Sequence, residues 1–234
     1  MPELNAVDTE VPRLNERRVR RASNISGALS GVAMNDELQE DLSEIDVRPI
    51  CSDAELDAVY RLTHDAYVER DYCAPQPDGR LIHYPHLDRI PETTILVACS
   101  AGEVIGTISW TRDNANGLHV DSDFKTECDH IRKEGRGLAA SWRIATKNAC
   151  RAERRCVMAL IQAAVNLWFE SRVPTCVFTF NPRHERIYQR MLNMTTVARS
   201  AGTHGLNAAP AVLMRAEIEN LPERFARGLT SVKA

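Results

Sequence analysis

The chain has 234 residues, 44% of them hydrophobic and 26% charged, which is enough apolar material for one sizeable core and hardly for two. The formal net charge of −3 excludes a strongly basic nucleic-acid binder and leaves room only for a local basic patch. No run approaches the roughly 18 apolar residues of a membrane-spanning helix, so we expect a soluble protein, with a peripheral amphipathic face as its one open route to a membrane.

Seven cysteines are scattered through the chain without short paired spacings, and no apolar signal segment opens it. This pattern predicts reduced thiols in a cytoplasmic protein and no disulfide framework. His83 and His86 stand near Cys73, but no second pair of ligands follows at a standard spacing. We therefore expect no metal site, and we interpret these histidines as structural or solvent-exposed residues at the mouth of a pocket.

Residues 1–45 hold arginines in their first half and acids in their second half, with little to bury. We predict a flexible N-terminal arm over this range. Residues 45–50 alternate between apolar and polar side chains as a strand does. Ser52 and Glu55 then have the spacing of a capping box, which predicts a helix that runs to about Arg70.

Four prolines and a glycine interrupt residues 71–92. We interpret this range as a long loop with a functional task, because unstructured connections of this length are uncommon. Residues 93–100 and 104–112 predict two strands of a hairpin, in which Gly106 marks a bulge or a close backbone approach. A surface helix is predicted over 121–134.

The following stretch has the order strand, helix, strand, helix, with ranges 138–146, 151–172, 175–180 and a second helix that Asn181 and Pro182 open. A crossover through a helix makes the two strands parallel neighbours with a right-handed connection. Ligands of such sheets collect at the carboxyl ends of the strands, so we expect the functional site there.

Two further strands are predicted over 195–201 and 211–219. The complete order predicts one α/β domain over residues 46–220, with a mixed central sheet and helices on both faces. Residues 221–234 are predicted to form a polar tail.

Several short stretches match the pattern of one family. They are Tyr60-Arg61-Leu62 with Tyr67, Ile90-Pro91-Glu92-Thr93-Thr94, Val104-Ile105-Gly106-Thr107, Asn181-Pro182-Arg183-His184 with Tyr188, and Asn207-Ala208-Ala209-Pro210-Ala211-Val212-Leu213. On these stretches the chain resembles the long-chain N-acyl amino acid synthases, a branch of the GNAT superfamily related to the acyl-homoserine-lactone synthases. The resemblance implies a GNAT-like fold and an N-acyltransferase that moves a long-chain fatty acyl group from acyl carrier protein to the amino group of an amino acid.

The turn after the first strand of the central unit points to the acyl donor. A turn that binds coenzyme A brings backbone N–H groups to a pyrophosphate with the help of glycines, and residues 147–155 contain none. The turn offers Lys147, Arg151, Arg154 and Arg155, which suit one phosphate and an acidic carrier protein. We expect acyl-phosphopantetheine of the carrier as donor substrate, with acyl-CoA as the alternative and no bound cofactor. A solvated helix start is the structural alternative.

Candidate catalytic residues follow from the needs of acyl transfer, which are a proton acceptor, an oxyanion donor and a proton for the departing thiolate. The resemblance implies that the strand ending near Thr146 offers a backbone N–H to the oxyanion. Tyr188 can protonate the thiolate, and His184 shares its helix face four residues earlier. Glu92, where the long loop enters a strand, is a candidate base or ammonium anchor. The alternatives are a core tyrosine, a packed histidine and an exposed glutamate.

Candidate substrate-binding residues are arginines that can hold a carboxylate and aromatics that can line an acyl chain. The lactone synthases carry Glu-x-x-Arg on the strand that reads Ala140-Ser141-Trp142-Arg143 here, so the arginine is kept and the acid is missing. This departure argues against lactone synthesis and leaves water or His184 as further candidate proton acceptors. The substrate-binding set is Arg61, Trp110, Trp142, Arg143, Phe180 and Asn181.

Two other functions remain open from the sequence. One is a conventional acetyl-CoA-dependent N-acetyltransferase of the same fold, which the glycine-free turn disfavours. The other is a non-catalytic acyl-binding module that has kept the groove and lost its acid.

Overall fold

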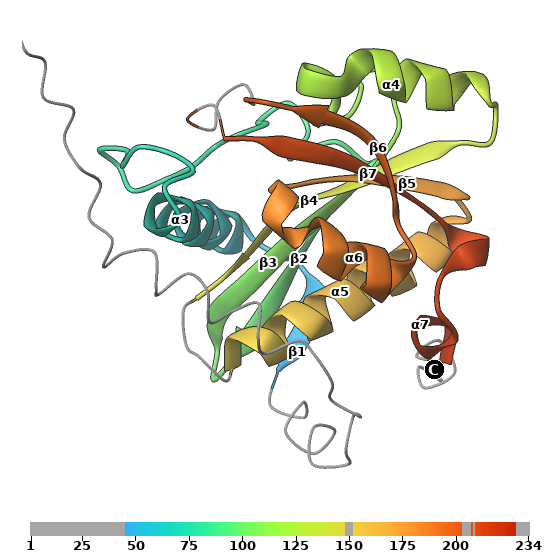
Figure 1. Ribbon diagram of the computed structural model, residues 1–234. Helices are drawn as coiled ribbons and strands as arrows, with labels where there is room; N and C mark the ends of the chain where they lie inside the picture. Colours follow the sequence, from blue (N-terminus) through green and yellow to red (C-terminus); the bar gives the residue numbers. More distant parts are fainter. Residues whose placement is uncertain (1–44, 148–151, 203–206, 208, 228–234) are drawn as a thin grey trace, which may run out of the picture. The chain divides into compact units, whose positions relative to one another are not determined.

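The computed structural model describes residues 45–147, 152–202, 207 and 209–227. These residues form a seven-stranded sheet with the order β1-β2-β3-β4-β5-β7-β6 (Figure 1). Among the described strands, β4 and β5 pair in parallel and every other neighbouring pair is antiparallel. The predicted mixed sheet and the predicted parallel pair are confirmed. The predicted arm lies, apart from residue 45, outside the described residues.

The first strand, β1 (Asp46–Pro49), leads into helix α3 (Asp53–Glu69). The Ser52 side chain accepts a hydrogen bond from the backbone N of Glu55 at 3.2 Å, which confirms the predicted cap. The Glu55 carboxylate in turn accepts from the backbone N of Cys51 at 2.8 Å. The two side chains therefore satisfy two backbone N–H groups at the start of the helix. The segment from Arg70 to Glu92 then runs without helix or strand, as predicted.

Strands β2 (Thr93–Ser100) and β3 (Glu103–Arg112) form the predicted hairpin. A Cβ at Gly106 would overlap the Cys156 Sγ and lie 2.9 Å from the Leu160 Cδ1, both on helix α5. Gly106 pairs with Ala98, and the sheet register shifts directly beside this pair, because the next pair joins Cys99 to Val104. Gly106 therefore marks a close approach of helix and sheet and also adjoins a bulge, so both features that the sequence suggested are present.

The remaining elements follow the predicted order as far as β7, and two short helical elements come after it. They are α4 (Asp121–Lys133), β4 (Leu138–Thr146), α5 (Ala152–Ser171), β5 (Thr175–Phe180), the 3-10 turn η3 (Pro182–His184), α6 (Glu185–Leu192), β6 (Thr195–Ser200), β7 (Ala211–Glu217), the 3-10 turn η4 (Ile218–Asn220) and α7 (Glu223–Arg227).

Helices cover both faces of the sheet, as predicted. On one face, α5 packs on Ile108 and Trp110 of β3. On the other, α3 packs on Ala145 of β4, and α4 packs on Ala140 of β4 and Val177 of β5. Because successive strand residues point to opposite faces, each of the central strands contributes to two cores.

Helix α7 extends the packed region beyond residue 220. Its Phe225 is 2% exposed and belongs to the same cluster as Trp168 of α5 and Met214 of β7. The predicted tail therefore includes a residue of the core in its described part.

Strands β4 and β5 pair along only part of their length. Leu138–Ser141 of β4 lie opposite Thr175–Phe178 of β5, and no pairing follows although β4 continues to Thr146 and β5 to Phe180. β4 stays paired with β3 as far as Thr146, so among the described strands it is the pairing with β5 that ends at Ser141. We call the separated residues, 142–146 and 179–180, the fork.

Candidate active site

One face of the fork carries a stack of aromatic rings. The Phe178 and Phe180 ring centroids are 5.9 Å apart, and the Phe180 and Tyr188 centroids are 3.7 Å apart with nearly parallel planes. Trp110 belongs to the same cluster. Burial, with a smaller effect of Tyr72, raises the pKa of Tyr188 to about 12, so this hydroxyl stays protonated at neutral pH and can donate a proton or a hydrogen bond.

His184 and Asn181 lie where β5 passes into α6. The Asn181 side chain accepts a hydrogen bond from the backbone N of Arg183 at 3.2 Å and so caps the turn. His184 Nε2 accepts from Arg183 Nε at 3.0 Å, and burial together with Arg183 and Arg70 lowers its pKa to about 4. His184 is therefore neutral, and one of its ring nitrogens is already occupied.

The opposite face of the fork holds a buried ion pair. Arg143 Nη2 donates to Asp88 Oδ1 at 2.5 Å, and the two side chains are 2% and 1% exposed. The Tyr60 hydroxyl of α3 donates to the other oxygen of Asp88 at 2.8 Å. Asp88 comes from the 71–92 loop, so this loop supplies a partner to the site.

Arg143 keeps unused donors. Within the part of the chain that the structure describes, its Nε and Nη1 atoms are buried without a hydrogen-bond partner. A buried unpaired donor costs about 1–3 kcal/mol, which a bound anion would recover. The residue also has φ of +54° at the point where the register between β3 and β4 shifts, a conformation that non-glycine residues rarely adopt outside functional sites.

Trp142 and His119 complete this face. The Trp142 Nε1 donates to Thr111 Oγ1 at 2.9 Å, and the Arg143 guanidinium lies 4.2 Å from the centroid of the Trp142 ring. The imidazole of His119 stacks on Trp142 with centroids 5.4 Å apart, and Tyr84 of the loop meets both rings edge-on. Trp142 therefore lies on the opposite face of the sheet from Trp110, although both were predicted to bind the substrate.

His119 was not singled out from the sequence. It precedes α4, between the buried residues Leu118 and Val120, and it is 5% exposed. Those apolar neighbours are the one sequence signal that points to its burial. Its contacts with β4 and β5 come from distant parts of the chain and leave no local pattern.

Two predicted site residues lie apart from the fork. Arg61 is exposed on α3 and pairs with Asp57 at 2.9 Å. Glu92 is half-buried, and its carbonyl accepts from the backbone N of Arg112, which lies opposite Ala139 near the start of β4. The structure therefore brings together Tyr188, His184, Phe180 and Asn181 around one face of the fork and Arg143 with Trp142 on the other, without Arg61 or Glu92.

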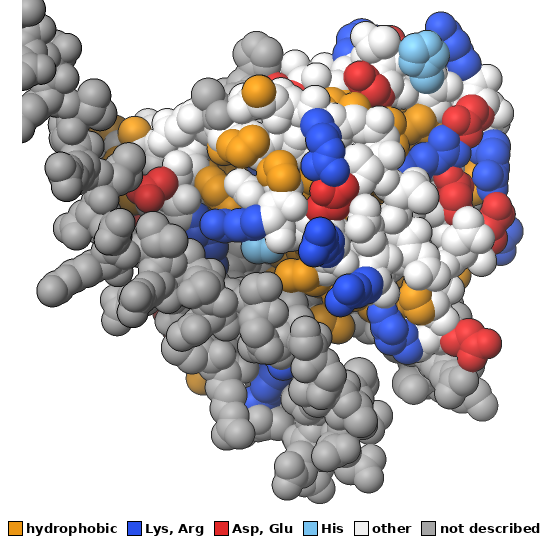
Figure 2. Space-filling view, in the orientation of Figure 1, with side chains coloured by type: hydrophobic (Ala, Val, Ile, Leu, Met, Phe, Trp, Pro, Cys, Tyr) orange, Lys and Arg blue, Asp and Glu red, His pale blue; other side chains and the backbone are white. Residues whose placement is uncertain are grey.

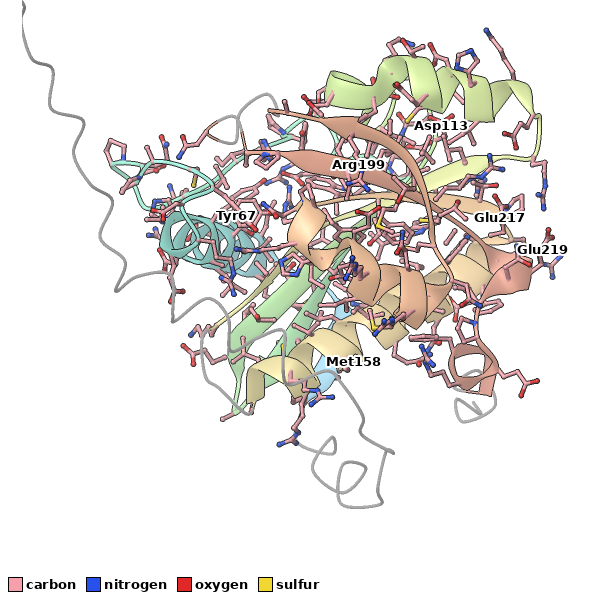
Figure 3. The ribbon with its side chains drawn as sticks, in the orientation of Figure 1. Tyr67, Asp113, Met158, Arg199, Glu217 and Glu219 are labelled. Atoms are coloured by element: carbon pink, nitrogen blue, oxygen red, sulfur yellow. The ribbon has the colours of Figure 1, made fainter. Side chains whose placement is uncertain are left out.

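The predicted basic turn is described only in part. Lys147 is exposed directly after β4 and pairs with Glu103, while Arg151 lies outside the described residues. Arg154 is exposed and Arg155 half-buried near the start of α5. Further basic side chains lie on the face that carries α6 (Figure 2). Arg186 and Arg190 of α6 are exposed. Figure 3 shows Arg199 of β6 on the same side of the molecule.

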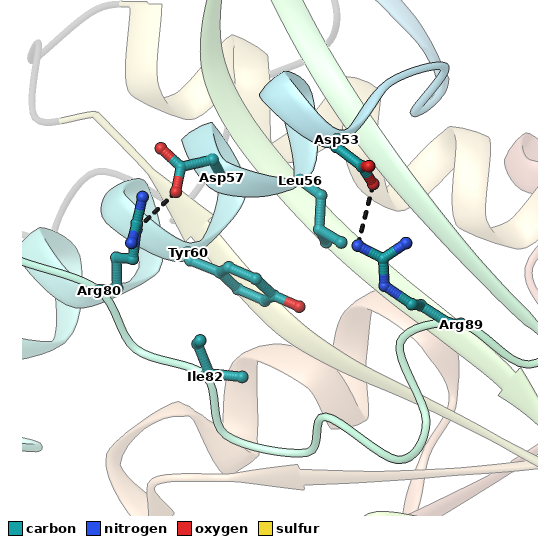
Figure 4. A pocket seen from close by; sticks show the side chains of 7 residues that line it. All are labelled: Asp53, Leu56, Asp57, Tyr60, Arg80, Ile82 and Arg89. Carbon is teal, nitrogen blue, oxygen red and sulfur yellow. Dashed lines mark hydrogen bonds and ion pairs between the residues drawn. The ribbon is translucent and has the colours of Figure 1, made fainter.

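A hollow of about 230 Å³ lies between α3 and the 71–92 loop (Figure 4). Two ion pairs flank it, Arg89 with Asp53 at 2.9 Å and Arg80 with Asp57 at 2.5 Å. Its lining consists of Asp53, Leu56, Asp57, Tyr60, Arg80, Ile82 and Arg89. Through Tyr60, whose hydroxyl reaches Asp88, the hollow adjoins the buried pair at the fork.

Comparison with known proteins identifies a family that the chain matches. The family described as N-acyl amino acid synthase FeeM matches residues 58–217 of the chain. The solved structure of FeeM, an N-acyl amino acid synthase from uncultured soil microbes, is 22% identical, covers 75% of this chain and 91% of its own, and has a TM-score of 0.65. No curated protein sequence matches the chain significantly.

Two further structures share the fold. The CoA-dependent acyl-homoserine lactone synthase BjaI is 17% identical, covers 84% of this chain and 83% of its own, and has a TM-score of 0.52. An acetyltransferase of the GNAT family from Streptococcus pneumoniae is 13% identical, covers 75% and 99%, and has a TM-score of 0.51. The predicted GNAT-like fold is confirmed.

None of the helices described combines the length and apolarity that crossing a bilayer requires. No three histidine, cysteine or acidic side chains in the described ranges form a group that could hold a metal ion.

Proposed function

The chain belongs to the FeeM family of N-acyl amino acid synthases, and from this premise we propose that it transfers a long-chain fatty acyl group from acyl carrier protein to the amino group of an amino acid. Acyl transfer to nitrogen follows from the family. The carrier, the chain length and the free amino acid as acceptor are the proposal. The observation that carries it is the fork, which has an aromatic face on one side and a buried arginine with unused donors on the other.

The fork suits a thioester because its two sides offer different chemistry. Past Ser141 the edge of β4 no longer pairs with β5, so backbone N–H groups on this edge can stabilise the oxyanion of a tetrahedral intermediate. Phe178 and Phe180 present apolar rings to an acyl chain. Tyr188, stacked on Phe180 and protonated at neutral pH, is placed to donate to the departing sulfur.

The acceptor side suits a carboxylate. Asp88 takes only one nitrogen of the Arg143 guanidinium, and Tyr60 holds Asp88 in place. The remaining Nε and Nη1 donors, unpaired among the described residues, can bind the carboxylate of an amino acid whose amine then faces the thioester. A buried charge-assisted contact of this kind would select amino acids over simple amines.

The donor side suits a carrier protein. Arg154 and Arg155 follow the end of β4 at the start of α5, and α6 adds Arg186 and Arg190. An acidic carrier would meet positive charge at both helices beside the fork. A cytoplasmic place for the reaction agrees with the six described cysteines, all of which are free thiols.

The test is a product assay. Purified protein is incubated with an amino acid mixture and, in separate reactions, with acyl carrier protein thioesters of several chain lengths, long-chain acyl-CoA or acetyl-CoA. Mass spectrometry should reveal N-acyl amino acids from the long-chain carrier thioesters. Product from long-chain acyl-CoA alone would show that acyl-CoA, and not the carrier thioester, is the donor. Product from acetyl-CoA alone would indicate an acetyltransferase. No acylated amine in any reaction would refute the proposed function.

A further inference from the structure

His119 bridges the two strands at the point where they separate. Its Nε2 lies 3.4 Å from Oγ1 of Thr179, the first residue of β5 beyond the pairing with β4. Its ring stacks on Trp142, the first residue of β4 beyond that pairing, with 22° between the planes. The imidazole therefore lies at the base of the fork, on the same face as Arg143.

One nitrogen of this imidazole has no assigned task. Among the described residues, His119 Nδ1 is buried without a hydrogen-bond partner. In the tautomer that donates from Nε2 to Thr179, Nδ1 carries a free lone pair. Buried polar atoms are almost always paired in folded proteins, so an exception beside an unpaired arginine indicates a place where a ligand supplies the missing partners.

The surroundings keep the ring neutral. Burial, followed by the charges of His83 and Arg143, lowers the pKa of His119 to about 3, while Tyr84 and Trp142 pack on it without a negative charge. A neutral imidazole accepts hydrogen bonds, and a protonated one does not. A substrate carboxylate bound to Arg143 would offset the positive charge that opposes protonation, so the ring would become more basic when the acceptor binds.

We propose that His119 is the proton acceptor for the attacking amine, an inference that rests on the proposed transfer to nitrogen. The amine nitrogen forms a bond to the thioester carbonyl carbon and passes a proton to Nδ1, and the carbon–sulfur bond then breaks. The sulfur leaves with the bonding electron pair and takes one proton, either from solvent or from Tyr188, which then regains a proton from solvent. His119 returns its proton to solvent, which leaves an amide and a free thiol as the products.

The other candidates for this task are committed elsewhere. His184 Nε2 already accepts from Arg183, and both oxygens of Asp88 accept from Arg143 and Tyr60. Glu92 lies beside the start of β4, before the fork begins. In the described part of the chain, His119 is the histidine at the fork with a buried and unpaired ring nitrogen.

Two amide variants test the two ring nitrogens separately. His119→Gln carries its amide near the position of Nε2 and can keep the contact with Thr179, whereas His119→Asn carries its amide near Nδ1. Neither amide accepts a proton at neutral pH. We expect both to lower kcat at least about 100-fold at pH 7 with KM for the acyl donor unchanged. Thr179→Val, which removes the Nε2 contact that sets the tautomer but keeps the imidazole, should lower kcat less than either amide variant does.

The pH profile separates catalysis from packing. If His119 accepts the proton, solvent base replaces it at high pH, so the deficit of both variants shrinks as the pH rises from 7 to 10. A deficit that is equal at every pH, or a folded His119→Gln with native kcat, overturns the proposal. The native enzyme is measured first. If it acylates no amine, the proposed function fails; if it is active, the variants then test the role of His119 alone.

A measurement on the native protein covers variants that fail to fold. Nitrogen-15 spectra of the histidine rings should show His119 neutral between pH 5 and pH 8, with Nε2 protonated and Nδ1 bare. A protonated ring, or a proton on Nδ1, overturns the proposal without any variant.

Discussion

Replacing Arg143 by methionine should destabilise the fold by about 3–5 kcal/mol, because it removes one partner of a buried ion pair. The Asp88 side chain is 1% exposed, and the substitution would leave Tyr60 as the one partner described for it. Asp88→Asn should cost a similar amount, since it leaves the guanidinium, 2% exposed, without its negative partner.

The double variant distinguishes this reasoning from simple loss of packing. Once both charges are removed, neither is left buried and uncompensated, so Asp88→Asn with Arg143→Met should be more stable than the sum of the two single costs by about 2 kcal/mol or more. Urea unfolding of the four proteins measures the cycle. Additive costs, within about 0.5 kcal/mol, would refute the claim that these two charges depend on each other.

The same positions predict a change of substrate preference. Arg143→Lys keeps a positive charge but not the planar set of donors, so we expect kcat/KM for amino acids to fall about tenfold or more. For the matching amine without a carboxylate, kcat/KM should change little, because that substrate makes no contact with the guanidinium. Equal losses for the two substrates would show that Arg143 does not bind the carboxylate.

Four further outcomes follow from the geometry. Tyr188→Phe should keep the stacked ring and the native fold while lowering kcat about tenfold or more, and native kcat would leave this residue only a packing role. Since the pKa of Tyr188 is about 12, its hydroxyl is protonated below that value, and the native enzyme should lose no activity through this group between pH 7 and pH 10. Reversing the charges of Arg154 and Arg155 should weaken carrier affinity and flatten its salt dependence, whereas the same change at Lys133 on α4 should not. Gly106→Ala should cost about 1–3 kcal/mol in urea unfolding, because α5 leaves no room for the added carbon; a cost near zero would contradict the close contact.

Local patterns in the sequence were sufficient to predict the elements. The strands over 138–146 and 175–180 have the predicted bounds, and Ser52 caps the helix that its spacing predicted. These features depend on side-chain alternation and on one residue three positions from another, so neighbouring residues determine them.

The site could be predicted only in part, because long-range contacts build it. Arg143 has a left-handed backbone without being glycine, and this bulge is invisible in a strand pattern that otherwise alternates regularly. Its partner Asp88 lies 55 residues earlier in the chain, in a loop whose conformation the sequence does not specify. His119 is buried through contacts with Trp142 and Thr179, neither of which is near it in sequence.

The central claim is that the acyl thioester enters between β4 and β5, and photo-crosslinking tests it most directly. An acyl group with a diazirine near its thioester end, carried on acyl carrier protein, is bound, irradiated and mapped by peptide mass spectrometry. If the thioester enters there, labels are expected within residues 142–146 of β4 and among Phe178, Phe180 and Tyr188. Labels confined to the hollow around Ile82, or spread over α4 with none at the fork, would contradict it.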